Sequence, residues 1–284
     1  MSAVAPRNFP RGVVGVLLLL PAMVVIAVAF VMPLVRLVSM SFSAKSGMLG
    51  AYEELLGEDI YWLVLWNTMR LAVVVTTITL ALGFAVAMAM SRLSGTWRIG
   101  LFACVVLPLW ISVLVRTFSW MLILEKNGPL NRFLLAGGII DEPLSFLFNF
   151  TGVMIGMVHV LLPYAALPIY AALVKIDPAL LRASEGLGAS GITTFRRIVL
   201  PLATKGIATA ATFTFLLSLG FFITPALLGG AKSTTISMLI DTFVNERLAW
   251  PLASAASIIL LALALGVIAI AARFVPISGL AEAR

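Results

Sequence analysis

The segment DPALLRASEGLGASGITTFRRIVLP, residues 177–201, is the longest polar-containing stretch between two strongly apolar ones. Its opening Asp-Pro pair supplies an N-cap and a proline at the first helical position. We therefore predict a short helix from Pro178 to Leu187, ended by Gly188 in the left-handed conformation that suits a helix C-terminus. Ser190 can begin a second short helix, which we expect to end before the final proline. The segment is thus predicted to form a helix–turn–helix elbow between two membrane segments, with an ordinary basic loop as the alternative.

The composition places the whole chain in a membrane. Of its 284 residues, 62% are hydrophobic and 11% are charged, too few charges to cover the surface of a soluble protein. We predict a single all-α membrane domain, because a helix satisfies its own backbone hydrogen bonds in lipid. Each span needs about 20 apolar residues to cross a hydrocarbon core of roughly 30 Å. Six spans are expected, at residues 13–36, 68–91, 99–124, 151–174, 206–230 and 249–273.

The basic residues predict how the chain is oriented. The net charge of +7 is scattered over helix ends, which favours a role in topology over nucleic-acid binding. With the N-terminus inside, the inner segments carry eleven Lys and Arg residues. The outer loops then carry only five, namely Lys45, Lys126, Arg132, Lys232 and Arg247. By the positive-inside rule, both termini and the elbow are expected in the cytoplasm.

The residue types argue against an enzyme or a metal protein. His159 is the only histidine, and no cluster of Cys, Asp or Glu accompanies it in the apolar stretches. The stretch GGAKST at 229–234 fails as a phosphate loop, because Pro225 occupies the first glycine position and Ala231 separates the second glycine from the lysine. We therefore expect no cofactor in this chain. The expected spans contain no carboxylate, which weakens an ion-coupled carrier as an alternative. A passive channel or scaffold is another alternative.

Arg116 is the one ionised group deep in an apolar stretch, with Trp110 and Trp120 on either side. A charge at the bilayer centre costs roughly 2.5–3.5 kcal/mol on insertion scales, so it should face a partner or a water-filled cavity. The functional interpretation is a pathway or gating residue. The alternative is an arginine that reaches the outer interface or caps a neighbouring helix.

The fourth expected span contains further candidates. His159 is interpreted first as a hydrogen-bonded interior residue and second as a substrate contact. Two prolines can break the helix near Tyr164, so that freed backbone groups line a cavity. Gly152 and Gly156 form a GxxxG pattern that permits close helix approach.

The elbow resembles the EAA loop of ABC importer permeases. That loop reads E-A-A, three residues, G, nine residues, I-x-L-P, and Gly188 and the segment 198–201 match it in spacing and identity. Arg182 stands where the family has the glutamate, and Ser184 stands for the second alanine. Without the glutamate, a salt bridge that it would form in the family is not expected here, whereas docking of the loop is still expected. The resemblance implies that the elbow is a coupling helix that docks in a cleft of a cytoplasmic ATPase. The residues it assigns to coupling are Arg182, Ala183, Ser184, Glu185, Gly188, Ala189, Ser190, Ile198, Leu200 and Pro201.

Other motifs are similar to those of spermidine/putrescine-type permeases. They are LPLWISVLVRTFSW at 107–120, followed by Asn131, and TPALLGGAK at 224–232, and the similarity extends over about residues 50–275. The resemblance implies a type I importer fold of six transmembrane helices in a bacterial plasma membrane. It also implies four kinds of partner: a second, homologous permease, a dimer of ATPase subunits that binds ATP and Mg, an extracytoplasmic solute-binding protein, and a small-molecule substrate.

A polyamine is the first expectation for the transported solute. Phe221 and Phe222 offer aromatic faces, and each can attract a cation by roughly 0.5–2 kcal/mol. If Arg116 faces the pathway, an opine, a phosphonate or another anionic or zwitterionic solute is the alternative. The residues expected on the substrate pathway are Arg116, Trp110, Trp120, His159, Tyr164, Phe221, Phe222 and Thr224.

Overall fold

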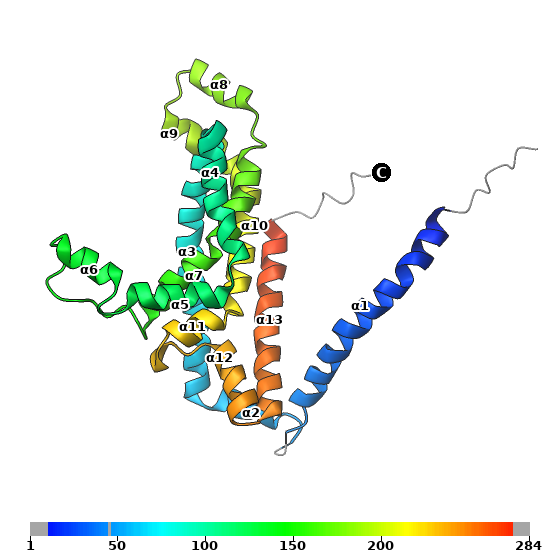
Figure 1. The fold of residues 1–284 in the computed structure, drawn as a ribbon. Coiled ribbons are helices and arrows are strands. Elements are labelled where there is room, and N and C mark those ends of the chain that lie inside the picture. The colour runs from blue at the N-terminus through cyan, green and yellow to red at the C-terminus, as the bar shows by residue number, and fades with distance from the viewer. Residues whose placement is uncertain (1–10, 45–46, 275–284) are drawn as a thin grey trace, which may run out of the picture.

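The computed structural model describes residues 11–44 and 47–274, and every regular element within them is a helix. Three long helices form the centre of the molecule (Figure 1): α3 (Asp59–Arg92), α7 (Phe150–Leu173) and α10 (Leu200–Leu219). They pack through small side chains, among them Ala87, Ala165 and Ala203, which are fully buried. Small residues let helices approach closely in a membrane, where packing drives their association.

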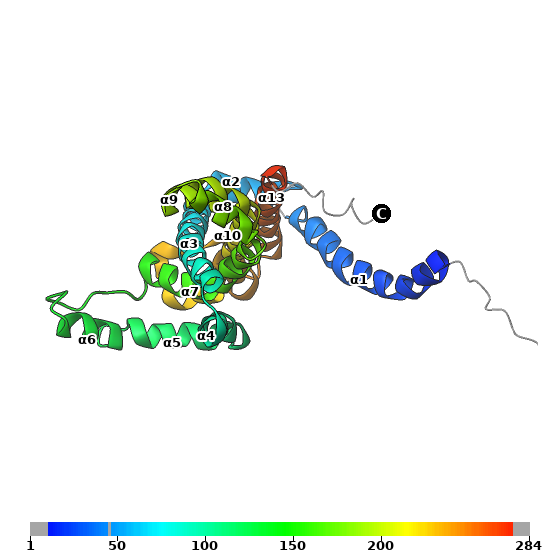
Figure 2. The ribbon, with the colours of Figure 1, turned by 90° about the horizontal axis from the view of Figure 1, so that it is seen from above.

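Two more long helices flank this bundle, α1 (Arg11–Ser41) and α13 (Trp250–Phe274). Helix α1 contacts mainly α13 and leaves the bundle on the side away from α6 (Figure 2). Most of its large apolar side chains between Leu18 and Val38 are exposed, so this surface is left for lipid or another subunit to cover. Within the described residues, five helices are long and apolar enough to cross a membrane, or six if one bent pair counts as a span.

Short elements connect the long helices. Helices α2 (Gly50–Gly57), α11 (Ile223–Leu228) and α12 (Ile236–Asp241) lie towards the end of the bundle opposite the elbow, and α6 (Pro129–Ala136) lies to one side of the bundle (Figure 1). The 3₁₀ turn η3 (Ala231–Ser233) precedes α12, and the π turn η4 (Thr242–Glu246) follows it. The elbow consists of α8 (Pro178–Gly186) and α9 (Gly191–Thr194). In Figure 1 the elbow, the first residues of α1 and the last residues of α13 lie towards the same side of the molecule.

The expected third span, residues 99–124, is not one helix. Helix α4 (Gly95–Val106) passes into the 3₁₀ turn η1 (Leu107–Trp110), and α5 (Val113–Leu124) then leaves at 106°. Two features break the helix: Pro108 lacks the N–H that an α-helix needs, and Ile111 is extended. As a result α5 lies across the bundle, beside α11 and α7 (Figure 1).

The expected fifth span, residues 206–230, is displaced towards the elbow. Helix α10 ends at Leu219, and the chain then turns back through α11. At its other end, α9 continues through the π turn η2 (Phe195–Val199) into α10, so the break expected before Pro201 is absent. A π turn tolerates this proline because the Leu200 N–H donates to the Phe195 carbonyl, five residues back, and the ladder is already shifted.

The other expected spans correspond to single helices. They are 13–36 for α1, 68–91 for α3, 151–174 for α7 and 249–273 for α13. Helix α3 begins at Asp59, because the apolar stretch IYWLVLW continues the helix at the end opposite the elbow.

The GxxxG pattern of α7 marks a close approach, as predicted. A Cβ built on Gly156 would lie 2.7 Å from Leu228 Cδ1 and 2.8 Å from Thr224 Cγ2, both on α11. Replacing Gly156 with isoleucine is therefore expected to destabilise the protein by about 1–3 kcal/mol, the usual cost of overpacking. The measurement is the melting temperature of the purified protein in detergent. The control is Gly100→Ala on α4, where a Cβ meets no atom within 4 Å. Equal melting temperatures for the Gly156→Ile and Gly100→Ala variants would contradict the close approach of α7 and α11.

Candidate functional site

The first helix of the elbow is capped at both ends by side-chain and backbone groups. Asp177 Oδ1 accepts the backbone N–H two residues later over 2.8 Å, which starts α8. At its other end Gly188 has a φ of +75°, and its N–H donates to the Glu185 carbonyl over 2.9 Å. The following N–H donates to the Ser184 carbonyl over 3.0 Å, which completes a Schellman cap. The N-cap and the glycine turn predicted from the sequence are confirmed.

The two helices of the elbow are joined to each other and to the bundle. Ser190 Oγ accepts the backbone N–H three residues later over 3.3 Å and so caps α9, as predicted. The hydroxyls of Ser184 and Thr194 share a hydrogen bond of 2.8 Å, which ties α8 to α9. Phe195 meets Phe84 of α3 edge to face, with ring centroids 5.7 Å apart. Helix α9 also continues through η2 into α10, so the elbow is joined to a membrane helix without a break in the helical backbone.

The exposed surface of the elbow includes three large apolar side chains. The side chains of Leu187, Ile192 and Leu180 are 88%, 69% and 45% exposed. Of the residues assigned to coupling, the exposed ones are Arg182, Ala183, Glu185, Gly188, Ser190, Leu200 and Pro201, while Ser184 is buried and Ala189 and Ile198 are half-buried. A large apolar surface on a polar segment marks a site of contact with another molecule.

A second candidate site lies where α5, α7 and α11 meet. The hydroxyls of Thr117 on α5 and Thr224 on α11 share a hydrogen bond of 3.0 Å, and both residues are buried. Arg116 is only 7% exposed, and its Nε and Nη1 atoms are buried without a hydrogen-bond partner among residues 11–44 and 47–274. It lies within electrostatic range of Tyr164 and His159 on α7. The junction therefore holds a guanidinium with unused hydrogen-bond donors.

Aromatic side chains surround this junction. Trp120 meets the His159 ring edge to face, with centroids 5.5 Å apart. The buried His159 Nδ1 has no hydrogen-bond partner in the part of the chain that the structure describes. Phe221 packs in the same hydrophobic cluster as Trp120. Tyr164 and Phe222 are 40% and 38% exposed, so both present part of a ring to the outside of the chain.

The structure brings six of the expected pathway residues to this junction: Arg116, Trp120, His159, Tyr164, Phe221 and Thr224. Trp110 lies apart in η1 and is 84% exposed. Phe222 precedes α11 at the turn after α10. In the described residues, no three His, Cys, Asp or Glu side chains lie close enough together to hold a metal ion.

Several buried polar residues were not assigned a role from the sequence, although Thr117 and Asn131 belong to the motifs quoted above. Thr117 joins α5 to α11, and Thr76 and Thr79 on α3 are buried with hydroxyl oxygens that lack a partner. Asn131 is fully buried and holds the loop after α6, because its amide donates to the Leu144 carbonyl and its Oδ1 accepts the Leu144 N–H. The only available signal was a polar residue within an apolar run, and many such residues simply bond to their own helix.

Residues 80–276 match the family described as binding-protein-dependent transport system inner membrane component. The chain belongs to this family. It is 36% identical over 221 residues to the spermidine/putrescine transport system permease protein PotB of Escherichia coli (strain K12), covering 78% of the chain and 80% of the relative. It is 28% identical over 281 residues to the sulfoquinovosyl glycerol transport system permease protein SmoG of Agrobacterium fabrum (strain C58 / ATCC 33970), covering 92% and 90%.

The fold agrees with this membership. A chain of a bacterial ABC transporter involved in the import of the acidic polysaccharide alginate superposes with a TM-score of 0.81 over 93% of this chain and 96% of that one, at 20% identity. The type I ABC importer permease fold expected from the motifs is thereby confirmed. The permease is an inner membrane transport subunit, and its relatives are permease subunits rather than enzymes.

Proposed function

We propose that this permease forms half of the pathway of an ATP-driven importer and that its elbow is the coupling helix. The observation that carries this proposal is the construction of the elbow: both of its helices are capped, it exposes Leu180, Leu187 and Ile192, and it is continuous with α10. A rigid segment of this kind can pass a movement of a partner to the membrane helices, whereas a flexible basic loop would absorb it.

The proposal implies a definite set of partners and an orientation. A cytoplasmic dimer of ATPase subunits, which would hold the ATP and Mg, grips the elbow, and a second permease completes the pathway. A solute-binding protein delivers the solute from the other side, in keeping with the family description. The excess of basic residues on the elbow side supports a cytoplasmic elbow and cytoplasmic termini.

For the solute, we propose a polyamine such as spermidine or putrescine. The support is the 36% identity to a spermidine/putrescine permease over most of both chains. The partly exposed rings of Tyr164 and Phe222 offer aromatic faces to an ammonium group. In this case Arg116 acts as a gate, because a guanidinium cannot serve as a ligand for a cationic solute.

An anionic solute is the second candidate, and Arg116 is the observation that favours it. Its buried Nε and Nη1 have no partner within the described residues, and a carboxylate, sulfonate or phosphonate would supply the missing acceptors. The likeness to a sulfoquinovosyl glycerol permease over 92% of the chain is compatible with such a solute.

The test is the ATPase rate of the purified complex in liposomes with its solute-binding protein. Putrescine and spermidine are added first, followed by a panel of sulfonates, carboxylates and phosphonates. We expect the polyamines to stimulate ATP hydrolysis several-fold over the basal rate, because the loaded solute-binding protein shifts the complex towards the conformation that hydrolyses ATP. Stimulation by an anion alone would replace the polyamine with the second candidate. The coupling proposal itself would be wrong if no ATPase subunit co-purified with the permease.

A further inference from the structure

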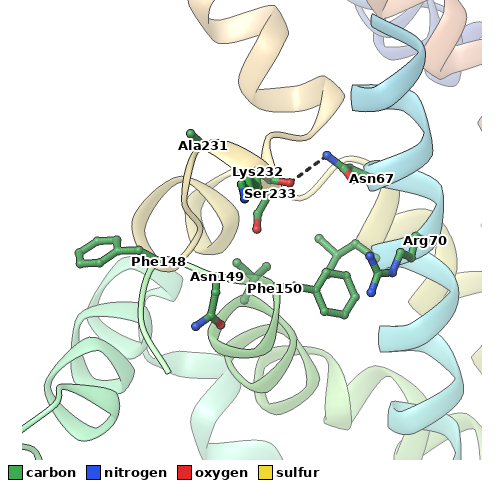
Figure 3. Close-up of a pocket in the computed structure, with 10 residues that line it drawn as sticks. Asn67, Arg70, Phe148, Asn149, Phe150, Ala231, Lys232 and Ser233 are labelled. Atoms are coloured by element: carbon green, nitrogen blue, oxygen red, sulfur yellow. Dashed lines mark hydrogen bonds between the residues drawn. The ribbon is translucent and has the colours of Figure 1, made fainter. Parts of the chain in front are cut away.

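A cavity of about 300 Å³, shown in Figure 3, lies between α3, the start of α7 and η3, towards the end of the bundle opposite the elbow in Figure 1. Three elements form its walls: α3 with Asn67 and Arg70, the start of α7 with Phe150, and η3 with Lys232 and Ser233. Two of these side chains are cations, and none of the described residues that line the cavity is a carboxylate. The N-terminus of α7 adds the positive end of a helix dipole. The cavity is therefore built for an anion and repels a polyamine.

The length of α3 indicates where the cavity lies across the thickness of the membrane. Arg92 closes this helix at the elbow end, and Arg70 lies 22 residues before it. At 1.5 Å per residue the two arginines are about 33 Å apart, slightly more than the roughly 30 Å of a hydrocarbon core. If Arg92 marks one membrane interface, Arg70 lies at the other. Trp66, one turn beyond Arg70, is 63% exposed, as expected of a tryptophan at the headgroup level.

The contacts that hold the walls of the cavity in place take no hydrogen bond from the Arg70 or Lys232 side chain within the described residues. The Asn67 amide donates to the backbone carbonyl of Lys232 over 3.1 Å (Figure 3), and the ammonium group of that lysine takes no part in this hydrogen bond. The Arg70 guanidinium lies over the Phe150 ring at 4.5 Å, a contact with the ring face that leaves its N–H groups available. A Cβ on Gly230 would collide with the carbonyl oxygen of Phe148, so η3 is pressed against the loop before α7.

We propose that this cavity binds the phosphate of an anionic phospholipid, such as phosphatidylglycerol, in the leaflet opposite the elbow. Arg70 and Lys232 pair with the phosphate, and the amide and hydroxyl groups beside them can bind the headgroup. Leu71 and Val153 give the cavity an apolar floor for the glycerol backbone. The membrane depth and the exposed Trp66 favour a lipid over an acidic side chain of a protein partner.

The test is lipid binding to the purified permease complex, measured by native mass spectrometry after delipidation. Phosphatidylglycerol, phosphatidylcholine and glycerol 3-phosphate are titrated separately. We expect wild type to prefer phosphatidylglycerol, and Arg70→Gln and Lys232→Gln each to weaken its binding roughly fivefold, the usual effect of one basic residue on an anionic lipid. Lys126→Gln, at an exposed loop lysine outside this cavity, is the matched control and should bind as wild type does.

Each other result overturns the proposal in a recognisable way. Undiminished phosphatidylglycerol binding by the Arg70→Gln, Lys232→Gln double variant would remove the cavity from lipid binding. Glycerol 3-phosphate binding as tightly as the lipid would make this a site for a free phosphate ester. If the double variant bound the lipid normally but needed a higher concentration of solute-binding protein for half-maximal ATPase stimulation, the cavity would instead bind a carboxylate of that partner. The charge-conserving variant Arg70→Lys should retain binding, which separates loss of charge from misfolding.

Discussion

Replacing Gly188 with valine is expected to lower solute uptake about five- to thirtyfold, which corresponds to the 1–2 kcal/mol that the left-handed conformation costs a residue with a Cβ. The glycine has a φ of +75°, and a Cβ at this position would meet no atom within 4 Å. The effect must therefore come from backbone strain and not from a clash. Strain opens the Schellman cap, so that α8 no longer keeps its angle to α9 and ATP hydrolysis is uncoupled from transport. Uptake and ATPase rate are measured on the same proteoliposomes.

Two nearby substitutions make this result specific. Gly186→Ala changes a glycine in the same elbow that has a negative φ and open space around it, and it should leave uptake unchanged. Gly188→Asn should retain more uptake than Gly188→Val, because asparagine tolerates the left-handed conformation better than a β-branched residue. If Gly188→Val transported solute as well as wild type does, the elbow would have no part in coupling.

Replacing Arg116 with alanine is expected to reduce uptake roughly tenfold or more without loss of assembly. A buried charge without a partner costs stability, so its removal should leave the melting temperature of the complex unchanged or slightly raised. Such a residue is retained for a partner that arrives during transport, either an anionic solute or a group of the second permease. Initial uptake rates over a range of solute concentrations provide the measurement.

The form of the loss then separates the two candidate solutes. A raised half-saturation concentration would mean that Arg116 binds the solute, as the anionic candidate requires. A lower maximal rate at unchanged half-saturation would mean that it acts as a gate, as the polyamine proposal requires. Arg132→Ala, at an exposed arginine on α6, is the control and should transport normally. Failure of the Arg116→Ala complex to assemble would show that the arginine has a structural role instead.

The elbow could be predicted almost residue by residue, because its interactions are local. Asp177, Gly188 and Ser190 act on backbone groups within a few positions of themselves, so residue type and spacing are enough to identify the caps. The one local error was the end of the second helix. A proline normally stops a helix, but here the π turn just before Pro201 joins α9 to α10, and its Phe195 packs against Phe84 of α3, a contact between distant segments.

The junction at Arg116 could not be assembled from the sequence, because its residues come from three separate helices. Thr117, the neighbour of Arg116, and Thr224 are more than a hundred positions apart, and their hydroxyls meet only because α5 turns across the bundle and α11 turns back towards it. Hydropathy measures how apolar a stretch is and not the direction of its axis. For that reason 99–124 and 206–230 both read as straight spans, whereas each contains a turn.

Composition and local pattern thus determined the class of this protein, its number of apolar segments and the form of its elbow, since each depends on the solvent around the chain or on neighbouring residues. The tertiary structure alone decided which polar side chains lie without partners and which meet across helices. It also decided that Arg70 and Lys232, far apart in the chain, share one cavity. These features depend on the packing of distant segments, and a single sequence does not contain the angles at which its helices cross.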